Sequence, residues 1–383
     1  MPSFCGTLEF RDPDSVEMKR IIRGLGRRIQ EGLRDHEIRN RSFQVPEDGI
    51  HVLVAKDPPP DGIERGGRVK FSALERAFPG SPDRFNILYV LSSALPAVPE
   101  AWIEWARRGG ARVVWNQNGV GYPAWAPETY EAINAQFRRL MALTDHVIYQ
   151  STFCIASTSR WVGHEPTAST VIPNAVDTAF YTPRDPPLPP SPLILLLCGS
   201  HQTACRVEAP LDALQNLVSG NLDVQLRISG VFDFPGGETR VREMIAARSL
   251  QDRVRITGPY RREEAPALFR EGHILIHPKY KDPCPTVVIE ALASGLPVVG
   301  SATGGLPELV GDAGVLIEVE DSWDALITPS GDQLAEAVRT LLDRHADHAA
   351  CARNRAVTLF DETGWIQAHH EAFVQVLATA GRA

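Results

Sequence analysis

The sequence predicts an α/β protein made of two Rossmann-like, doubly wound domains that face each other across a cleft. Its 383 residues are too many for one ordinary core, so two domains are expected. Short apolar runs alternate with longer stretches of helical periodicity, which is typical of βαβ units and a parallel sheet. The alternation is interrupted at 180–192, where six prolines fall within thirteen residues. Because proline fixes φ and removes a backbone donor, we expect this segment to be an interdomain linker.

The first series of elements precedes the linker. Its strands are short apolar runs, and helical spacing of apolar residues marks two helices between them. We expect strands at 51–55, 86–93, 111–119 and 146–151, and helices at 97–110 and 127–145. We assign residues 46–185 to this first domain and treat residues 1–45 as an N-terminal extension.

The second series follows the linker and repeats the same alternation. We expect strands at 193–200, 223–230, 253–258, 273–278 and 297–301, and helices at 212–219, 241–249, 265–272 and 286–295. A last helical stretch occupies 363–380. Residues 186–362 are therefore assigned to the second domain. Two such domains place a ligand between the carboxyl ends of their sheets.

The N-terminal extension contains an amphipathic stretch at 18–34, where apolar residues recur every three or four positions with Lys and Arg between them. Three glycines weaken this helix, each by up to about 1 kcal/mol relative to alanine. We expect it to pack on its own domain. The alternative is peripheral contact with an anionic membrane, at the inner membrane face.

Composition excludes several classes of function. A net charge of −8 argues against binding of a nucleic acid polymer. The six cysteines include no C-x-x-C pair, which argues against a zinc ribbon or a disulfide framework. No apolar run approaches the roughly 18 to 20 residues that a membrane helix needs. The N-terminus lacks the pattern of a secretory signal, so we expect a cytoplasmic protein.

Common nucleotide-binding motifs are absent from the sequence. It contains neither a G-x-x-x-x-G-K-[ST] phosphate loop nor a G-x-G-x-x-G after a strand, which argues against P-loop hydrolases and standard dinucleotide dehydrogenases. The D-x-D at Asp12 and Asp14 does not follow a strand, and we expect no metal site.

The most informative segment is 277–318. It predicts a strand, a loop that contains Asp282, and a helix that Thr286 opens and that carries Glu290 one turn later. The free N–H groups at the start of that helix would bind an anion. Carboxylates on either side would accept hydrogen bonds from sugar hydroxyls, so the segment suits a nucleoside diphosphate sugar. The glycine pair at 304–305 is expected to let backbone approach the ligand.

This segment resembles the donor-binding motif of the retaining GT-B glycosyltransferases of family 4, the glycosyl transferases group 1. The family pattern is an acid, seven residues, Glu, then A-x-A-x-G-x-P-V-V and G-G-x-P-E. This chain has Asp282, seven residues, Glu290, then ALASGLPVV and GGLPE. Weaker similarity covers VIPNAVDTAFYTP at 171–183 and GGRVK at 66–70. The resemblance implies the GT-B fold, with the final helix, 363–383, returning to the first domain.

The resemblance also implies roles for residues of the donor loop. Glu290 would accept hydrogen bonds from the ribose, and Asp282 would contact hydroxyls of the transferred sugar. Thr286 and Val287 would offer backbone amides to the diphosphate. Cys284 lies in the same loop and is counted among the donor-binding residues. No base is placed near its thiol by the sequence, so we do not expect a nucleophile there.

Two further loops are implied to contact the donor. Gly258, Pro259 and Tyr260 follow a predicted strand and would lie against the base. Gly66 and Gly67 would let the first domain approach the diphosphate from the other side.

The chain departs from the family pattern at several positions. Asp282 is one methylene shorter than the commoner Glu, and Pro285 removes one backbone donor. Ser200 occupies the place of an arginine that neutralises phosphate in the family. Arg206 and His201 are the nearby sources of positive charge, and we favour Arg206.

The third strand of the first domain also lacks a histidine that often follows it in the family. The chain reads NQNG there, so Asn116, Gln117 or Asn118 must take that place. Asn118 could hydrogen-bond a sugar hydroxyl or the acceptor, or it could simply form an Asn-Gly turn. Trp125 is expected in the core, with a place in an acceptor groove as the alternative.

By this resemblance we expect a sugar to be transferred from a UDP- or GDP-linked donor to an acceptor hydroxyl, with retention of configuration and without a metal or cofactor. Asp282, Asn118 and Arg206 are the candidate catalytic residues. The acceptor is left open among a saccharide, a lipid-linked glycan and a small molecule. The alternatives are a GT-B phosphorylase or epimerase, and a catalytically degenerate protein that binds nucleotide sugar beside another transferase.

Overall fold

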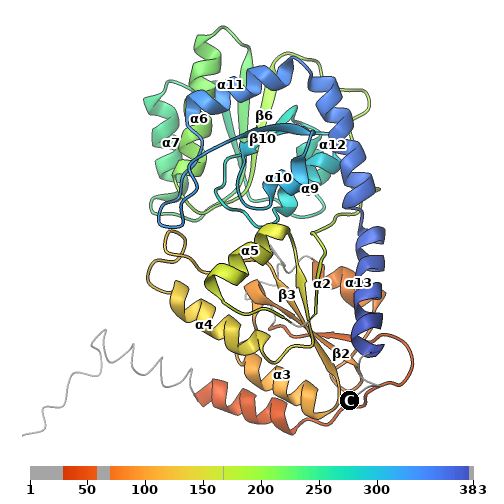
Figure 1. The fold of residues 1–383 in the computed structure, drawn as a ribbon. Coiled ribbons are helices and arrows are strands. Elements are labelled where there is room, and N and C mark those ends of the chain that lie inside the picture. The colour runs from red at the N-terminus through yellow and green to blue at the C-terminus, as the bar shows by residue number, and fades with distance from the viewer. Residues whose placement is uncertain (1–28, 58–69, 167, 379–383) are drawn as a thin grey trace, which may run out of the picture.

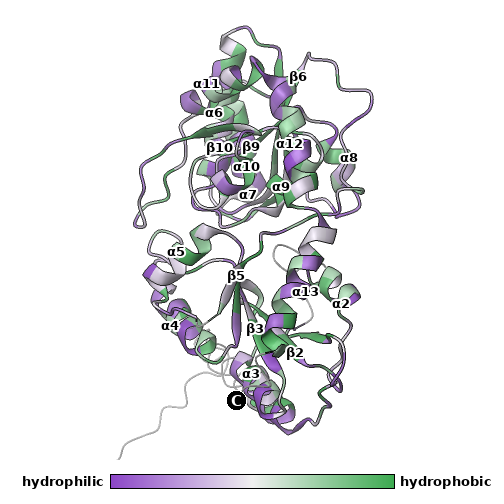
Figure 2. Cartoon of the chain, turned by 45° about the vertical axis from the view of Figure 1, so that its right-hand side comes forward, coloured by the Kyte–Doolittle hydropathy of each residue, from purple (hydrophilic) through white to green (hydrophobic). Residues whose placement is uncertain are grey.

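The computed structural model describes residues 29–57, 70–166 and 168–378. They form two parallel β-sheets, one in each half of the molecule, with helices packed around them (Figure 1). This arrangement confirms the predicted α/β class with two Rossmann-like domains. Hydrophilic and hydrophobic residues share the helices that cover the sheets, such as α4 and α13 (Figure 2).

The first domain holds a sheet with the strand order β1-β2-β3-β4-β5. Its strands are β1 (Val52–Val54), β2 (Ile87–Leu91), β3 (Arg112–Gln117), β4 (His146–Tyr149) and β5 (Ser169–Val171). Its helices are α2 (Phe71–Ala77), the short 3-10 helix η2 (Ser92–Ala94), α3 (Pro99–Arg108), α4 (Tyr130–Met141) and α5 (Thr152–Trp161). Every residue of β2 and β4 is buried, because helices cover both faces of a parallel sheet.

The second domain holds a sheet with the strand order β11-β10-β9-β6-β7-β8. Its strands are β6 (Leu193–His201), β7 (Val224–Phe232), β8 (Val254–Gly258), β9 (Ile274–His277), β10 (Val298–Ser301) and β11 (Gly314–Ile317). Its helices are α6 (Cys205–Ser219), α7 (Gly237–Ala247), α8 (Ala265–Phe269), α9 (Thr286–Ala293), α10 (Leu306–Val310), α11 (Gly331–Leu342) and α12 (His345–Leu359). The order reverses between β6 and β9, which is where an open α/β sheet binds its ligand.

The last helix, α13 (Glu362–Ala378), packs on the first domain although it follows the second in sequence (Figure 1). Its Trp365 and Phe373 share a hydrophobic cluster with strands β1 and β2. The Phe373 ring lies 5.2 Å from that of Phe78 in an edge-to-face contact. The first core is therefore completed by the end of the chain.

The chain crosses between the domains at two neighbouring places. The first crossing runs from Asn174 toward the proline-rich segment, which is irregular, and the second lies between α12 and α13. The N–H of Glu362 donates to the carbonyl of Val176 at 2.9 Å, and the Thr178 hydroxyl donates to Asp361 at 2.5 Å. The two crossings thus support each other.

The part of the N-terminal extension that the structure describes is helical at 29–40 and packs on α3. Ile38 is buried in the first core, and Arg39 pairs with Asp35 and Glu104. Residues 18–28, where most of the predicted amphipathic stretch falls, lie outside the described residues, so its contact with a membrane stays a prediction. Within the described ranges, no helix combines the length and the hydrophobicity needed to cross a bilayer.

Candidate functional site

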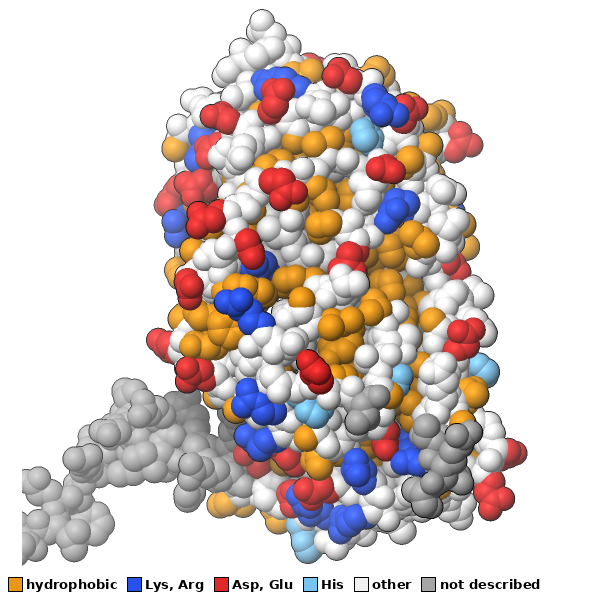
Figure 3. All heavy atoms as spheres, viewed as in Figure 1, with side chains coloured by type: hydrophobic (Ala, Val, Ile, Leu, Met, Phe, Trp, Pro, Cys, Tyr) orange, Lys and Arg blue, Asp and Glu red, His pale blue; other side chains and the backbone are white. Residues whose placement is uncertain are grey.

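A cavity of about 1420 Å³ lies between the carboxyl ends of the two sheets. It is lined from the first domain by the loops after β2, β3 and β4, and from the second by the ends of β6 and β9 and by the start of α9. On the face drawn in Figure 3, hydrophobic side chains gather where the two domains meet. The volume exceeds the roughly 300–1,000 Å³ of common small-molecule pockets, so two substrates fit side by side.

The loop from β9 to α9 is held in place by the glycine pair. Gly305 donates its N–H to the carbonyl of Asp282 at 2.9 Å, and a Cβ on Gly305 would lie 2.0 Å from the Pro283 carbonyl oxygen. Gly304 has a φ of +68°, and a Cβ there would lie 2.4 Å from the Asp282 carbonyl oxygen. The close approach that requires glycine here is to the backbone of the loop itself. That the pair also lets backbone approach a ligand stays a prediction.

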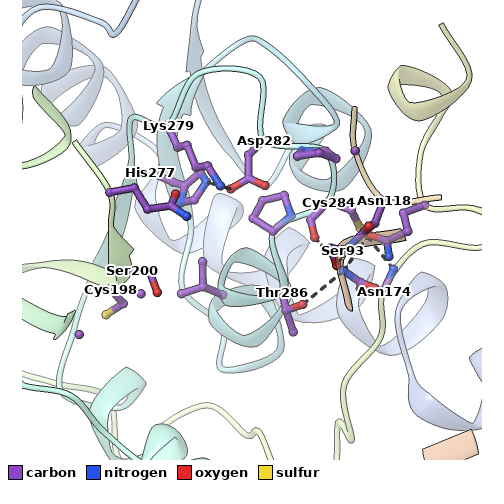
Figure 4. A pocket seen from close by; sticks show the side chains of 18 of the residues that line it. Ser93, Asn118, Asn174, Cys198, Ser200, His277, Lys279, Asp282, Cys284 and Thr286 are labelled. Carbon is purple, nitrogen blue, oxygen red and sulfur yellow. Dashed lines mark hydrogen bonds and ion pairs between the residues drawn. The ribbon is translucent and has the colours of Figure 1, made fainter. Parts of the chain in front are cut away.

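Asp282 points into the cavity from this loop (Figure 4). Its Oδ2 lies 3.1 Å from the Lys279 ammonium and 3.3 Å from Nε2 of His277. Burial alone would raise the pKa of Asp282, but Lys279, His277 and Arg206 together hold it below its ordinary value. Asp282 is therefore a carboxylate. Neither Lys279 nor His277 was among the predicted site residues, although Lys279 stands three residues before the acid.

The start of α9 opens on the same cavity, which Thr286 and Val287 line. Asn174 of the first crossing braces it, because its amide donates to the Cys284 carbonyl at 2.8 Å and to the Thr286 hydroxyl at 3.3 Å. The backbone N–H of Asn174 also donates to the Cys284 sulfur at 3.3 Å. Burial raises the pKa of Cys284 to about 12, so this side chain is a neutral thiol. Asn174 was not among the predicted residues.

Glu290 faces the cavity one turn into α9. Its carboxylate accepts a hydrogen bond from the Tyr181 hydroxyl at 2.9 Å. Burial raises the pKa of Glu290 to about 7, against the opposing effects of Tyr181 and Arg262. The carboxyl group is thus poised between its two protonation states near neutral pH, and a hydrogen-bond donor in the cavity would favour the carboxylate.

The structure separates the two predicted sources of positive charge after β6. Arg206 is buried, lines the cavity and donates to the Ser200 carbonyl, and its Nε has no hydrogen-bond partner among the described residues. His201 does not line the cavity. Its ring stacks on Phe232 at 5.2 Å, its Nε2 lies 3.2 Å from the Ser229 carbonyl, and burial lowers its pKa to about 3. Of these two residues, Arg206 is therefore the one available to an anion in the cavity.

The remaining donor-side predictions fall at different places. Ser200, Pro259 and Tyr260 line the cavity, whereas Gly258, the last residue of β8, does not. Gly66 and Gly67 lie outside the described residues.

A chain of hydrogen bonds leads from the first domain to the start of α9. The Lys70 ammonium and the Gln150 amide both donate to Oδ1 of Asn116, at 3.2 and 2.9 Å. The side-chain oxygen of Gln150 accepts a hydrogen bond from the Asn174 amide at 3.3 Å, and that amide also donates to the Thr286 hydroxyl. Burial lowers the pKa of Lys70 to about 8, which leaves the ammonium form in the majority at neutral pH. Of the predicted NQNG residues, Asn116 thus joins the domains rather than lining the cavity.

Asn118 lines the cavity from the first domain (Figure 4). Its Oδ1 accepts from the Ser92 hydroxyl at 2.5 Å, and its Nδ2 donates to the Ser93 hydroxyl at 2.6 Å. The two serines fix the amide, which retains one N–H to offer to a ligand.

Direct contacts hold the two domains together beside the cavity. The Glu308 carboxylate accepts from the backbone N–H groups of Thr152 and Phe153, at 2.9 and 3.1 Å, at the start of α5. The Ser151 hydroxyl donates to the Pro283 carbonyl at 2.8 Å. Trp323, from the segment after β11, stacks on Phe153 with ring centroids 5.9 Å apart.

The described residues contain no group of three or more His, Cys, Asp or Glu side chains arranged to hold a metal ion. The polar groups that the site offers include the carboxyl groups of Asp282 and Glu290, the start of α9 and the buried guanidinium of Arg206, and Asn118 adds an amide from the first domain.

Comparisons with known proteins agree with this architecture. Residues 192–344 match the family model "Glycosyl transferases group 1". Among solved structures, sucrose-phosphate synthase from Thermosynechococcus elongatus is 18% identical, with a TM-score of 0.65 over 86% of this chain and 89% of that one. Anabaena HepE in complex with UDP is 17% identical, with a TM-score of 0.61 over 76% of this chain and 79% of that one. These structures share the fold.

Curated relatives match over part of their length. The gpi3 subunit of the Schizosaccharomyces pombe phosphatidylinositol N-acetylglucosaminyltransferase is 24% identical over 56% of this chain and 44% of its own. The D-inositol 3-phosphate glycosyltransferase of Salinispora tropica is 33% identical over 38% of this chain and 31% of its own, and that of Thermobifida fusca 30% identical over 52% and 49%. The chain thus spans less than half the length of these relatives.

Proposed function

We propose that this chain is a glycosyltransferase that moves a sugar from a nucleoside diphosphate donor to an acceptor hydroxyl. The proposal starts from the GT-B fold and from the match of residues 192–344 to the glycosyl transferases group 1. The observation that carries this proposal is the meeting of three groups in one cavity: the start of α9, the buried Arg206 and the carboxyl groups of Asp282 and Glu290. A diphosphate needs the first two, and the hydroxyls of a ribose and a sugar need the carboxyl groups.

Each group has a separate task in the proposed reaction. The N–H groups of Thr286 and Val287, together with Arg206, bind the diphosphate and stabilise its charge as it leaves. Glu290 binds the ribose hydroxyls, and Asp282 orients the sugar. No metal ion is required, because the helix N-terminus and the arginine neutralise the leaving group.

We further propose retention of configuration by displacement on one face of the sugar. The bond between the anomeric carbon and the phosphate oxygen breaks, and the acceptor oxygen bonds to the same face. The acceptor proton passes to the departing phosphate oxygen. Asn118 offers its remaining N–H to the sugar or the acceptor, and closure of the domains excludes water from the reaction.

The donor nucleotide is proposed to be UDP or GDP, and UDP has the support of the HepE complex. A thermal-shift series with UDP, GDP, ADP and dTDP tests this, and we expect one of the first two to raise the melting temperature most. Glu290→Ala should weaken the binding of that nucleotide about 100-fold, because each charge-assisted hydrogen bond contributes about 1.5–3 kcal/mol. Glu336→Ala, at an exposed site, should leave binding unchanged. Unchanged affinity in Glu290→Ala would refute the ribose assignment.

Arg206 is tested by comparing UDP with uridine. Arg206→Met keeps most of the volume of the side chain and removes its charge. It should therefore lower the affinity for UDP at least tenfold and leave the affinity for uridine unchanged. Equal losses for both ligands would show that Arg206 supports the cavity rather than the phosphates.

A second candidate is a catalytically degenerate protein that binds nucleotide sugar beside another transferase. It is favoured by the engagement of Asn118 with Ser92 and Ser93, and by relatives described as a subunit and as a GtfA/B complex. Release of UDP from UDP-glucose, measured with and without candidate acceptors, separates the two. Tight UDP binding with no release under any condition would favour the degenerate protein.

The acceptor remains the least constrained part of the proposal. Two of the relatives are named for D-inositol 3-phosphate, which is a phosphorylated polyol. Their names alone would predict cationic side chains on the acceptor side of the cavity.

A further inference from the structure

The two sides of the cavity differ in charge. From the second domain it is lined by Arg206, Lys279, Asp282 and Glu290, among other charged residues. From the first domain, none of the described residues that line it is Lys, Arg, His, Asp or Glu. An acceptor on the side that the donor groups leave free would therefore meet uncharged side chains among the described residues.

Apolar side chains make up much of that wall. Val120, Ile133 and Phe137 line the cavity and pack together with the core of the first domain. Trp125 lines the same side and keeps 41% of its surface exposed. Ser93 and Asn118 stand beside these groups and supply hydrogen bonds to a hydroxyl. The wall thus offers a polar point next to a broad apolar surface.

Hydrogen bonds and close packing hold the backbone of the wall in place. The Asn134 side chain accepts from the N–H of Gly121 at 3.0 Å and donates to its carbonyl at 2.8 Å. A Cβ on Gly121 would lie 2.7 Å from the Cα of Tyr130, so glycine is needed for this close packing. The N–H of Ala124 donates to the Trp323 carbonyl at 2.9 Å. A surface fixed in this way loses little conformational entropy when it binds an apolar group.

Two lysines close to this wall are already paired. Lys279 lies 5.5 Å from the centre of the Trp125 ring, but its ammonium is paired with Asp282 at 3.1 Å. Lys70 donates to Asn116 and does not line the cavity. Among the described residues, the unpaired cations of the lining belong to the second domain: Arg206, Arg261 and Arg262. A phosphate held on the first-domain wall would therefore lose its water without gaining a positive charge from Lys279 or Lys70.

We propose that the acceptor is an uncharged molecule with an apolar body next to the hydroxyl that receives the sugar, and not a phosphorylated polyol. The hydroxyl lies at Ser93 and Asn118, and the apolar body lies on Ile133 and the open face of Trp125. This inference rests on the proposed function, since it takes the other side of the cavity to be the donor site.

The test compares three ligands that share one sugar: glucose, hexyl β-glucoside and glucose 6-phosphate. Each is titrated calorimetrically into the full chain saturated with UDP. We expect hexyl β-glucoside to bind at least tenfold more tightly than glucose, and glucose 6-phosphate to bind no more tightly than glucose. Hexyl β-glucoside that binds no better than glucose, or does not bind, overturns the inference, as does a tenfold gain from the phosphate.

Matched variants locate the binding surface. Trp125→Ala and Ile133→Asn should each remove most of the gain from the hexyl group, whereas Trp125→Phe should keep it. Ile155→Asn is the control, because Ile155 is 40% exposed on α5 and does not line the cavity. Equal gains in all four variants would place the hexyl group elsewhere and refute the inference. The melting shifts with UDP and with GDP, recorded on the same samples, report the donor site separately. Nucleotide binding without a hexyl gain refutes the inference about the acceptor alone, whereas binding of neither nucleotide refutes the proposed function.

Discussion

The two halves of the cavity are built in different ways. In the second domain, Asp282, Thr286 and Glu290 come from one continuous segment, the loop and first turns of α9. In the first domain, the lining comes from separate loops, after β2, β3 and β4, and from the side of α4. The difference teaches that a charged anion site can be encoded locally, whereas an uncharged wall depends on how distant parts of the chain pack.

The largest expected effect is on the half that depends on distant packing. Phe373→Ala removes a fully buried ring that α13 brings against Phe78 and should lower the free energy of unfolding by about 3–5 kcal/mol. Urea unfolding followed by tryptophan fluorescence measures it. Because α13 packs on the first domain, UDP affinity should fall much less than stability does.

Val374→Ala is the control for that variant. Val374 neighbours Phe373 on the same helix but is 47% exposed, so its loss should change stability by about 0.5 kcal/mol or less. Similar losses in the two variants would contradict the role of α13 in completing the first core.

The next effect concerns the locally encoded half and depends on pH. Burial raises the pKa of Glu290 from its ordinary 4.5 to about 7, so the folded state binds this proton more tightly than the unfolded state. The contribution of Glu290 to the stability of the folded state is fully present below pH 4.5 and is lost as the pH rises through 7. Glu290→Gln should therefore stabilise the free protein by up to about 3 kcal/mol at pH 8 and by almost nothing at pH 4.

The same variant should weaken UDP binding at pH 8, which separates stability from function at one side chain. Urea unfolding at both pH values, with and without UDP, measures the two effects. Glu336→Gln, on the exposed surface of α11, should show no such pH dependence. A Glu290→Gln variant that is no more stable at pH 8 than the wild type would contradict the raised pKa.

A smaller effect is expected from the support beneath the donor loop. Gly305→Ala would place a Cβ 2.0 Å from the Pro283 carbonyl oxygen, so the loop must shift. We expect a loss of about 1–3 kcal/mol in stability and a tenfold loss of UDP affinity, measured by urea unfolding and calorimetry. At Gly364 in α13 a Cβ would meet no atom within 4 Å, so Gly364→Ala should cost nothing. Wild-type UDP affinity in Gly305→Ala would show that the loop tolerates the shift.

The smallest effect tests the contact between the halves. Glu308→Ala removes a carboxylate from the start of α5 and should cost about 1 kcal/mol, because that charge favours the positive end of the helix. Small-angle scattering should show a more open molecule than the wild type. Glu318→Ala, at another exposed acid of the second domain, should leave the scattering unchanged. Unaltered scattering in Glu308→Ala would mean that other contacts hold the domains together.

The contrast between the halves also explains what the sequence could reveal. Most strands are apolar runs bounded by turns, and all those expected occur within a few residues of their predicted positions. Helix α5, the polar strand β5 and the segment from α10 to α12 were not anticipated. Helix α12 buries only Ala352 and Ala356 along its length, so it carries little apolar periodicity to detect.

Side-chain partners were harder to predict than elements. Asn174 lies more than a hundred residues from Cys284 and Thr286, and only the crossing of the chain brings them together. The sequence offered both His201 and Arg206 as sources of charge and favoured Arg206. In the structure, the ring of His201 at the end of β6 stacks on Phe232, whereas Arg206 on α6 lines the cavity. Lys279 was within reach of prediction, since the loop holds two of the few lysines in the chain.

The paired crossings have a consequence for how such proteins can be recombined. Because the N–H of Glu362 bonds to the carbonyl of Val176, the points where the chain leaves the first domain and where it returns are immediate neighbours. The second domain thus lies between Val176 and Glu362, two residues that are far apart in sequence but neighbours in space. We therefore expect that it can be exchanged with the corresponding domain of a related protein through two joints at one place, while the core that α13 completes stays intact. Under the proposed function, such a chimera would have the nucleotide preference of the protein that supplies the second domain. Its acceptor preference would be that of the protein that supplies the first domain.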